Sequence, residues 1–329
     1  MAVTAGTLSY AANRLAMLLN GEGEPSASAT DGDLIFESDM APRPLARTRD
    51  PQPDIWAVDG GQAMVADARC LGVYVARAGW VCFSDGACIV EEQGELRVWL
   101  LGGAEDRVAA ASLGLGIHAD CAVDVNLLRD HEEWQAVRLC IERACPGSVV
   151  LIDGDLQPDW RIPAPLLAGV LAEAAAAGIV LAGVVKRSGL AHRGAPLVGH
   201  LEGWAHETLG VRQRWWAPVA RTRGEAGTAR RVVVARLDPD ARYAFRIDLP
   251  EADDQTVEQI LGTLAAVSDD AAYPGYPYPL SVADRLAACP PGLRAEAGYT
   301  LDELLADAGV SAQVRERTFA DRHSLMERF

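Results

Sequence analysis

Two aspartates follow short apolar runs of the chain, and together they predict a site for charge chemistry. Asp59 follows the run 55–58, and Asp153 follows the run 149–152. Carboxylates at the ends of neighbouring strands repel each other unless a cation lies between them. Burying either carboxylate without a partner is strongly unfavourable. The pair therefore predicts a metal site, although a glycine follows each aspartate and an Asp-Gly turn is the simpler alternative.

Lys186 is the only lysine in the chain, and it follows a third apolar run, 179–185. Residues 165–177, between the second and third runs, have helical spacing. Strand, crossover helix and strand form a βαβ unit, which places Asp153 and Lys186 at the same edge of a sheet, where α/β proteins bind ligands. There the ammonium can neutralise a phosphate; the alternative is an ordinary surface charge at a strand end.

Further oxygen ligands are expected from helices that flank the sheet. In a helix over 127–145, Glu133 shares a stripe with apolar residues, whereas Glu132 lies nearer the solvent side. Asp284 is placed in the first turn of a helix over 282–288, and for both Glu133 and Asp284 the alternative is a favourable interaction with a helix macrodipole. With Asp59 and Asp153, these carboxylates suit two Mg²⁺ or Mn²⁺ ions about 3.5–4 Å apart that hydrolyse a phosphodiester.

A basic stretch of the chain suggests contacts with nucleic acid. From Arg212 to Arg236 there are seven arginines and one acid, with Trp215 and Trp216 among them. Arginines can follow a phosphate backbone while aromatic rings stack on bases. The alternative is a solvated arm with aromatic rings in the core. The residues predicted to bind nucleic acid are Arg187, Arg212, Arg214, Trp215 and Tyr276.

The order of the elements predicts an α/β fold with an RNase H-like mixed sheet flanked by helices and with N- and C-terminal helical extensions. Strands are expected at 55–58, 71–83, 87–90 and 96–101, then helix 127–145 and the βαβ unit, then strands 232–237 and 243–249. Helices are expected at 6–19, 254–267, 282–288 with Ser281 as N-cap, and 301–329. The predicted organisation is an N-terminal helix and acidic arm (1–53), a nuclease domain (54–290) with a basic, irregular insertion (about 189–231), and a C-terminal helical extension (291–329).

The composition limits the classes of protein that need to be considered. With 329 residues and 50% hydrophobic residues, the chain can bury a large core, and its net charge of −16 argues against a basic nucleic-acid coat protein. Seven cysteines without a CxxC pair predict reduced, buried thiols. The chain shows no signal peptide and no apolar run of about 18 residues, so we expect a soluble, cytoplasmic protein that does not bind membranes.

Four blocks occur in an order that resembles the NurA family of prokaryotic nucleases: AVDGG at 57–61, LIDGDL at 151–156, GVVKRS at 183–188 and GYPYPLSVADRLA at 275–287. The resemblance implies an RNase H-like homodimer with a central DNA channel. It also implies Mn²⁺-dependent 5′-3′ exonuclease and single-strand endonuclease activity, and work with the hexameric ATPase HerA on double-strand breaks. Metal or catalytic roles are carried over to Asp59, Asp153 and Glu133, whereas some members of the family have histidine where this chain has Asp284.

Two other functions are compatible with parts of the sequence. Actin- and hexokinase-like phosphotransferases also place Asp-Gly turns at strand ends, but their phosphate-binding hairpins carry a hydroxyl that the segment 59–62 lacks. A non-catalytic partner subunit of a DNA motor has no need for a cluster of Asp59, Asp153 and Lys186. The nuclease is therefore the preferred interpretation.

Overall fold

The computed structural model describes residues 7–20, 34–48, 53–114, 121–157, 159–192, 194–222 and 229–320. The strands are β1 (Leu34–Phe36), β2 (Arg43–Pro44), β3 (Ile55–Asp67), β4 (Gly72–Ser84), β5 (Ala87–Gln93), β6 (Arg97–Leu101), β7 (Val149–Asp153), β8 (Val180–Val185), β9 (Ala191–His192), β10 (Ala195–Pro196), β11 (Trp215–Thr222), β12 (Arg230–Arg236) and β13 (Phe245–Pro250). The helices are α1 (Leu8–Leu19), α2 (Glu105–Ser112), α3 (Val125–Arg143), α4 (Ala164–Ala176), α5 (Leu197–Leu209), α6 (Asp254–Ala266), α7 (Tyr278–Ala287), α8 (Pro291–Asp307) and α9 (Ala312–Phe319).

Most of these strands belong to one mixed sheet. Within the described residues its order is β1-β11-β12-β13-β8-β7-β3-β4-β5, and β2 and β6 pair with β11 and β4. The pairs β3–β7 and β7–β8 are parallel, and the other pairs in the sheet are antiparallel. The parallel pair β7–β8 is joined by the crossover helix α4, as parallel neighbours require. The predicted RNase H-like α/β fold is therefore confirmed.

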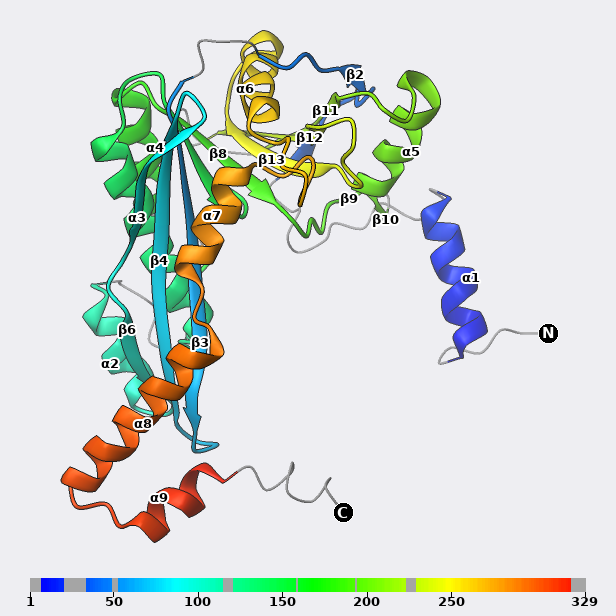
Figure 1. Cartoon of the computed structure of the whole chain (residues 1–329). Helices are drawn as coiled ribbons and strands as arrows, with labels where there is room; N and C mark the ends of the chain where they lie inside the picture. Colours follow the sequence, from blue (N-terminus) through cyan, green and yellow to red (C-terminus); the bar gives the residue numbers. More distant parts are fainter. Residues whose placement is uncertain are drawn as a thin grey trace.

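Helices cover both faces of the sheet (Figure 1). Side chains of α3 and α4 pack with Trp56, Val58 and Val150 on one face, and α5 packs on the same face further along. Side chains of α6 and α7 pack with Ile55, Ala57 and other residues of the opposite face. Alternating residues of the same buried strand therefore enter two separate cores, which explains why the runs 55–58 and 149–152 are apolar throughout.

The strand that carries Asp59 is much longer than the sequence suggested. We expected it to end in a turn at Asp59, but β3 continues to Asp67 and pairs with β4 along its whole length. The chain turns after β3, where Arg69 has a φ of 70°. Gly60 and Gly61 are thus strand residues in contact with helices. The Asp-Gly turn that the phosphotransferase alternative placed at Asp59 is therefore absent, whereas β7 does end at Asp153.

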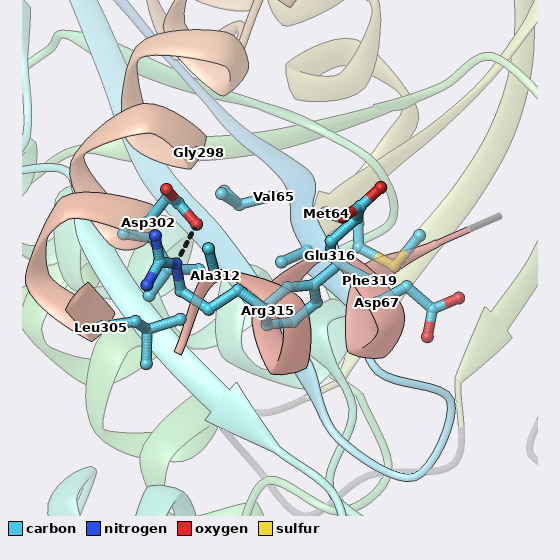
Figure 2. A pocket seen from close by; sticks show the side chains of 12 residues that line it. Met64, Val65, Asp67, Gly298, Asp302, Leu305, Ala312, Arg315, Glu316 and Phe319 are labelled. Carbon is cyan, nitrogen blue, oxygen red and sulfur yellow. Dashed lines mark hydrogen bonds and ion pairs between the residues drawn. The ribbon is translucent and has the colours of Figure 1, made fainter. Parts of the chain in front are cut away.

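The C-terminal helices α8 and α9 lie beside the far end of the long hairpin formed by β3 and β4 (Figure 1). Both α8 and α9 contact β3, and a cavity of about 610 Å³ lies between them and the strand's last residues (Figure 2). Arg315 on α9 donates to Asp302 on α8 at 2.6 Å, which ties the two helices together. Residues 321–329, which were predicted to be helical, lie outside the described residues.

Several local predictions were wrong. Residues 34–48, assigned to a loose arm, contain β1 and β2, which pair with β11. The stretch 189–231, expected to be irregular, contains α5 and β11. Helix α7 begins at Tyr278 after Pro277, so Ser281 lies inside the helix and is not its cap. The secondary structure of these segments depends on strand pairing and packing with distant parts of the chain. Their local sequence does not reveal these contacts.

The cysteines are free thiols, as predicted, but most of them are not buried. Cys82 and Cys140 are buried, whereas Cys70, Cys88 and Cys145 are exposed. No described helix combines the length and the apolar character that crossing a bilayer requires.

Candidate active site

Three carboxylates that are far apart in the sequence meet at one place on the sheet. Asp59 comes from β3, Asp153 from the end of β7, and Asp284 from α7. One carboxylate oxygen from each lies within 4.8 Å of the other two. Oxygen ligands on opposite sides of a Mg²⁺ ion lie about 4 Å apart, so the three groups fit one hard divalent cation with small adjustments. We call Asp59, Asp153 and Asp284 the acidic trio.

The register of the parallel strands brings Asp59 and Asp153 to the same level. Val58 is the partner of Ile152, and each aspartate is the next residue of its own strand. Since side chains alternate along a strand, both aspartates point to the face that α7 covers. The two carboxylates thus face each other at the point where β3 and β7 stop pairing.

Glycines in β3 and β4 allow α7 to approach closely enough to deliver Asp284. A Cβ atom at Gly61 would lie 1.9 Å from the carbonyl oxygen of Ala287, and one at Gly79 would lie 2.7 Å from the Ala287 nitrogen. Arg77 of β4 donates to the carbonyl oxygens of Ala287 and Ala288 and so holds the end of the helix. The second glycine of the AVDGG block is therefore a contact surface for the helix that completes the acidic trio.

Lys186 supplies the positive charge of the site. Its Nζ donates to Asp153 Oδ2 at 2.5 Å, and it also lies 5.0 Å from the centre of the Tyr276 ring, a cation–π distance. Burial opposes the charge of the ammonium, but the hydrogen bond and the charge of Asp153 outweigh it and raise the pKa of Lys186. Lys186 is thus held as a cation against the acidic trio.

The electrostatics of the acidic trio favour a bound cation. Burial raises the pKa of Asp59 to about 8; the charges of Asp153 and Asp284 add to this effect, and Lys186 and the backbone N–H of Gly60 oppose it. A pKa raised by burial and by like charges shows that the neighbouring groups do not offset the cost of placing a negative charge on the carboxylate. A divalent cation supplies that compensation, so these donors suit Mg²⁺ or Mn²⁺ better than a softer metal.

Tyr276, predicted to contact nucleic acid, lies beneath Lys186 and is only 6% exposed. Burial and the nearby charge of Asp153 raise the pKa of its phenol above the ordinary value. The ring therefore stays neutral and serves as a platform for the ammonium. A contact between Tyr276 and nucleic acid stays a prediction.

Glu133, the predicted helix ligand, reaches the site from the opposite face of the sheet. It is 2% exposed, its Oε2 lies 3.2 Å from Arg129, and its Oε1 has no hydrogen-bond partner among the described residues. A Cβ atom at Gly60 would lie 3.1 Å from Glu133 Oε2, so the first glycine of the block makes room for this carboxylate. Burial raises the pKa of Glu133 well above its usual value, although Arg129 opposes the shift. Glu133 is thus a buried acid next to Asp59 but outside the acidic trio.

The choice between the two adjacent glutamates follows from their surroundings. Glu132 lies 3.3 Å from Arg97 near the surface, whereas Glu133 shares the buried side of α3 with Val137 and Cys140. The predicted stripe is therefore present in the structure, and its position on α3 directs Glu133 towards Gly60 and Asp59.

Asp130, one turn before Glu133, gives a test of the electrostatics that needs no metal. Burial raises its pKa to about 6, although the Asp159 N–H donates to it at 2.7 Å. A folded-state pKa above the unfolded value means that stability is lost as the pH rises from about 4 to about 6. We expect Asp130→Asn to raise the free energy of unfolding by roughly 1–3 kcal/mol at about pH 8, with a smaller gain at about pH 5. Urea unfolding at the two pH values measures this, and equal gains would contradict the assignment.

Two residues predicted to contact DNA are placed on the surface. Arg187 is exposed next to Lys186. Arg212 has an 84% exposed side chain and lies 3.7 Å from Asp240. Both guanidinium groups are accessible to a phosphate backbone, and their contact with DNA stays a prediction.

Two other residues that were predicted to contact DNA, Trp215 and Arg214, have their main contacts inside the protein. Trp215 is 2% exposed because β11 lies inside the sheet and α5 covers it, so its ring is not accessible to a base. Arg214 donates to the carbonyl oxygen of Leu237 at 3.0 Å and lies 3.4 Å from Asp238, so it holds the loop after β12. Some of the arginines in the basic stretch 212–236 therefore form ion pairs inside the protein.

Sequence reasoning missed Arg129 and Arg77. Arg129 stands four residues before Glu133 on the same helix, and this spacing was a signal that could have found it. Arg77 acts through the end of α7, more than 200 residues later in the chain, and its position in β4 carried no local signal.

Comparison with known proteins shows which solved structures share this fold. No family model matches the sequence, and no curated protein matches it either. The structure is similar to the NurA nuclease from Sulfolobus solfataricus, with a TM-score of 0.58 and 14% identity over 92% of this chain and 94% of that one. A second NurA structure has a TM-score of 0.45 and 8% identity over 74% and 86% of the two chains. The catalytic domain of human endonuclease V has a TM-score of 0.41 and 15% identity over 94% and 100%. The chain therefore has the RNase H-like fold of the Sulfolobus NurA nuclease, and the resemblance seen in the sequence is confirmed at the level of the fold.

Proposed function

We propose that this protein is a metal-dependent DNA nuclease that hydrolyses phosphodiester bonds. The observation that carries the proposal is the acidic trio, whose three convergent carboxylates lie with the Lys186 ammonium beside the ends of the parallel strands β7 and β8. Ligands of open α/β sheets bind at such strand ends. The fold shared with the Sulfolobus NurA nuclease supports DNA as the substrate.

The acidic residues and the lysine of the site have different roles in the proposed reaction. Asp59, Asp153 and Asp284 hold the divalent cation, and Lys186 neutralises the scissile phosphate. When bound, the metal supplies Lewis-acid stabilisation of the phosphate charge and lowers the pKa of a coordinated water. The buried ring of Tyr276 limits the movement of Lys186, so the ammonium stays on the side of the sheet where the phosphate must lie.

A second ion is part of the proposal, with Glu133 as its additional ligand. Glu133 lies beside Gly60, and its buried Oε1 lacks a partner among the described residues. Either Mn²⁺ or Mg²⁺ suits a set made only of oxygen donors. Glu133→Gln tests this role, since it preserves the shape of the side chain and removes its charge.

The finer features of the proposal come from the resemblance to NurA. They are 5′-3′ exonuclease and single-strand endonuclease activity in the resection of double-strand breaks, a homodimer around a DNA channel, and work with a HerA-like hexameric motor. Support comes from the four ordered sequence blocks and from the shared fold.

Cleavage of end-labelled single- and double-stranded DNA by the purified protein tests the proposal. We expect cleavage in Mn²⁺ or Mg²⁺ and none in EDTA. Labels at the 5′ and 3′ ends of separate substrates report the direction of digestion. No cleavage under any condition, with or without a motor, would favour a non-catalytic partner subunit instead.

Binding of the metal can be measured without any nuclease assay. We expect Mn²⁺ to raise the melting temperature of the wild type, since a ligand at 100 times its Kd stabilises the folded state by about 2.7 kcal/mol. Asp59→Asn should lose this shift. It should also melt higher than the wild type in EDTA, because it removes a buried charge that its neighbours destabilise. Asp67→Asn, on the same strand but outside the acidic trio, is the control and should keep the Mn²⁺ shift.

A further inference from the structure

A second cavity, of about 620 Å³, adjoins the acidic trio. Lys186 and Asp284 belong to the candidate active site and also line this cavity. Its volume lies within the range of about 300–1,000 Å³ that is usual for small-molecule sites. A group bound here would therefore lie directly beside the phosphate that Lys186 and the acidic trio engage.

The remaining walls of this cavity are unusually aromatic. Tyr243, Phe245, Tyr273 and Tyr276 line it, and Tyr243 and Tyr273 are 57% and 64% exposed. Exposed tyrosines beside a polar catalytic centre contribute little to the core, but they offer rings on which a flat ligand can stack. Such rings bind nucleobases of any sequence, because every base has a π-face.

Two loops supply these rings, and a glycine holds the loops together. Tyr243 lies in the loop between β12 and β13, and Tyr273 lies in the segment before α7. Gly275, with a φ of 88°, comes so close to the first loop that a Cβ atom there would lie 2.4 Å from Ala241 Cβ. The two loops therefore pack closely against each other beside Asp284.

Cations accompany the aromatic rings. Arg242 lies 5.2 Å from the centre of the Tyr243 ring, and Lys186 lies over Tyr276. Arg212 lies 3.7 Å from Asp240, a residue that lines the cavity. Positive side chains interleaved with aromatic rings match a ligand that combines flat bases with a phosphate backbone.

We propose that this cavity is a nucleoside-binding subsite that holds one unpaired nucleotide next to the scissile phosphate. The proposal rests on the nuclease function proposed above and extends it to the form of the substrate. A base stacked on Tyr243 or Tyr273 must leave its duplex, and unpairing is easiest in single strands and at frayed ends. The enzyme therefore prefers single-stranded or frayed DNA, with little preference for base identity.

A fluorescent base analogue tests the subsite directly. A short oligothymidylate with one 2-aminopurine, placed at successive positions, is mixed with the protein in EDTA, where the DNA stays intact. We expect quenching at one or two positions in the wild type. The double variant Tyr243→Leu/Tyr273→Leu should lose this quenching and bind the DNA about 10- to 100-fold more weakly, because two stacking platforms are removed.

Matched variants separate stacking from folding. Tyr243→Phe/Tyr273→Phe keeps both rings and should quench as the wild type does. Tyr299→Leu, at an exposed tyrosine on α8, should change neither quenching nor affinity. Unchanged quenching and affinity in the folded double leucine variant would overturn the subsite.

Cleavage rates separate this proposal from the proposed function. The wild type should cut a frayed duplex end at least 10-fold faster than a blunt end closed by G·C pairs, and the double leucine variant should lose most of this preference. If the wild type cleaves both ends equally, the subsite is wrong and the nuclease stands. If the wild type cleaves no DNA while quenching persists, the nuclease is wrong and the binding site stands.

Discussion

Asp153→Asn should lower the rate of DNA cleavage in Mn²⁺ by about 1,000-fold or more. Asp153 is the one residue of the acidic trio that also binds Lys186, so the substitution weakens the hold on the metal and on the ammonium together. A metal contributes several kcal/mol of transition-state stabilisation, and each 1.36 kcal/mol corresponds to a factor of ten in rate. Single-turnover cleavage of end-labelled DNA at saturating protein measures the effect on the chemical step.

The control for this variant is again Asp67→Asn, which makes the same chemical change on the long hairpin away from the acidic trio. It should cleave DNA at the rate of the wild type. The melting temperature of Asp153→Asn in EDTA should stay close to that of the wild type, because the relief of like-charge repulsion in the acidic trio is offset by the loss of the ion pair with Lys186. Activity within a few-fold of the wild type in Asp153→Asn would remove the acidic trio from the mechanism.

Gly61→Ala should be among the most destabilising single substitutions in this chain. The added Cβ would lie 1.9 Å from a backbone oxygen of α7, which cannot move aside as a flexible side chain would. Overpacking of this kind costs typically about 1–3 kcal/mol and occasionally more. We expect a loss of at least about 3 kcal/mol in the free energy of unfolding, measured by urea denaturation, together with a loss of nuclease activity because Asp284 moves away from Asp59.

Gly60→Ala is the informative comparison for that variant. Its Cβ would lie 2.9 Å from the Cγ atom of Arg129 and 3.1 Å from Glu133 Oε2, so side-chain atoms, and not a backbone oxygen at 1.9 Å, must shift. We expect a smaller loss of stability for Gly60→Ala than for Gly61→Ala. Gly189→Ala, where nothing lies within 4 Å of the new Cβ, should leave stability and activity unchanged. Equal stability of the Gly60 and Gly61 variants would show that α7 does not pack on β3 as described.

The two glycine variants also test whether the AVDGG block is a strand segment that helices approach from both faces of the sheet. Consecutive residues of a strand point to opposite faces. Asp59 faces α7, Gly60 makes room for Glu133 on α3, and Gly61 makes room for the end of α7. The block is therefore a strand segment that two helices approach from opposite sides, with an acid at the level where they meet.

Sequence alone was sufficient to predict the central geometry of this protein. Three apolar runs, each followed by a polar residue, and one crossover helix place Asp153 and Lys186 together because parallel strands end at a common edge. The apolar stripe of α3 distinguished Glu133 from Glu132 for a similar reason, since helical periodicity is a local property. The RNase H-like fold follows from the order of such local elements.

Tertiary structure decided what depends on contacts between distant segments. Whether β3 ends at Asp59 is determined by its pairing with β4, and Asp-Gly in a sequence is compatible with either outcome. Trp215 is a core residue because α5 covers β11, which composition does not reveal. The position of Asp284 and the cavity beside it depend on close backbone approaches at Gly61 and Gly275. Periodicity reports the face of an element, and only packing determines which other element covers that face.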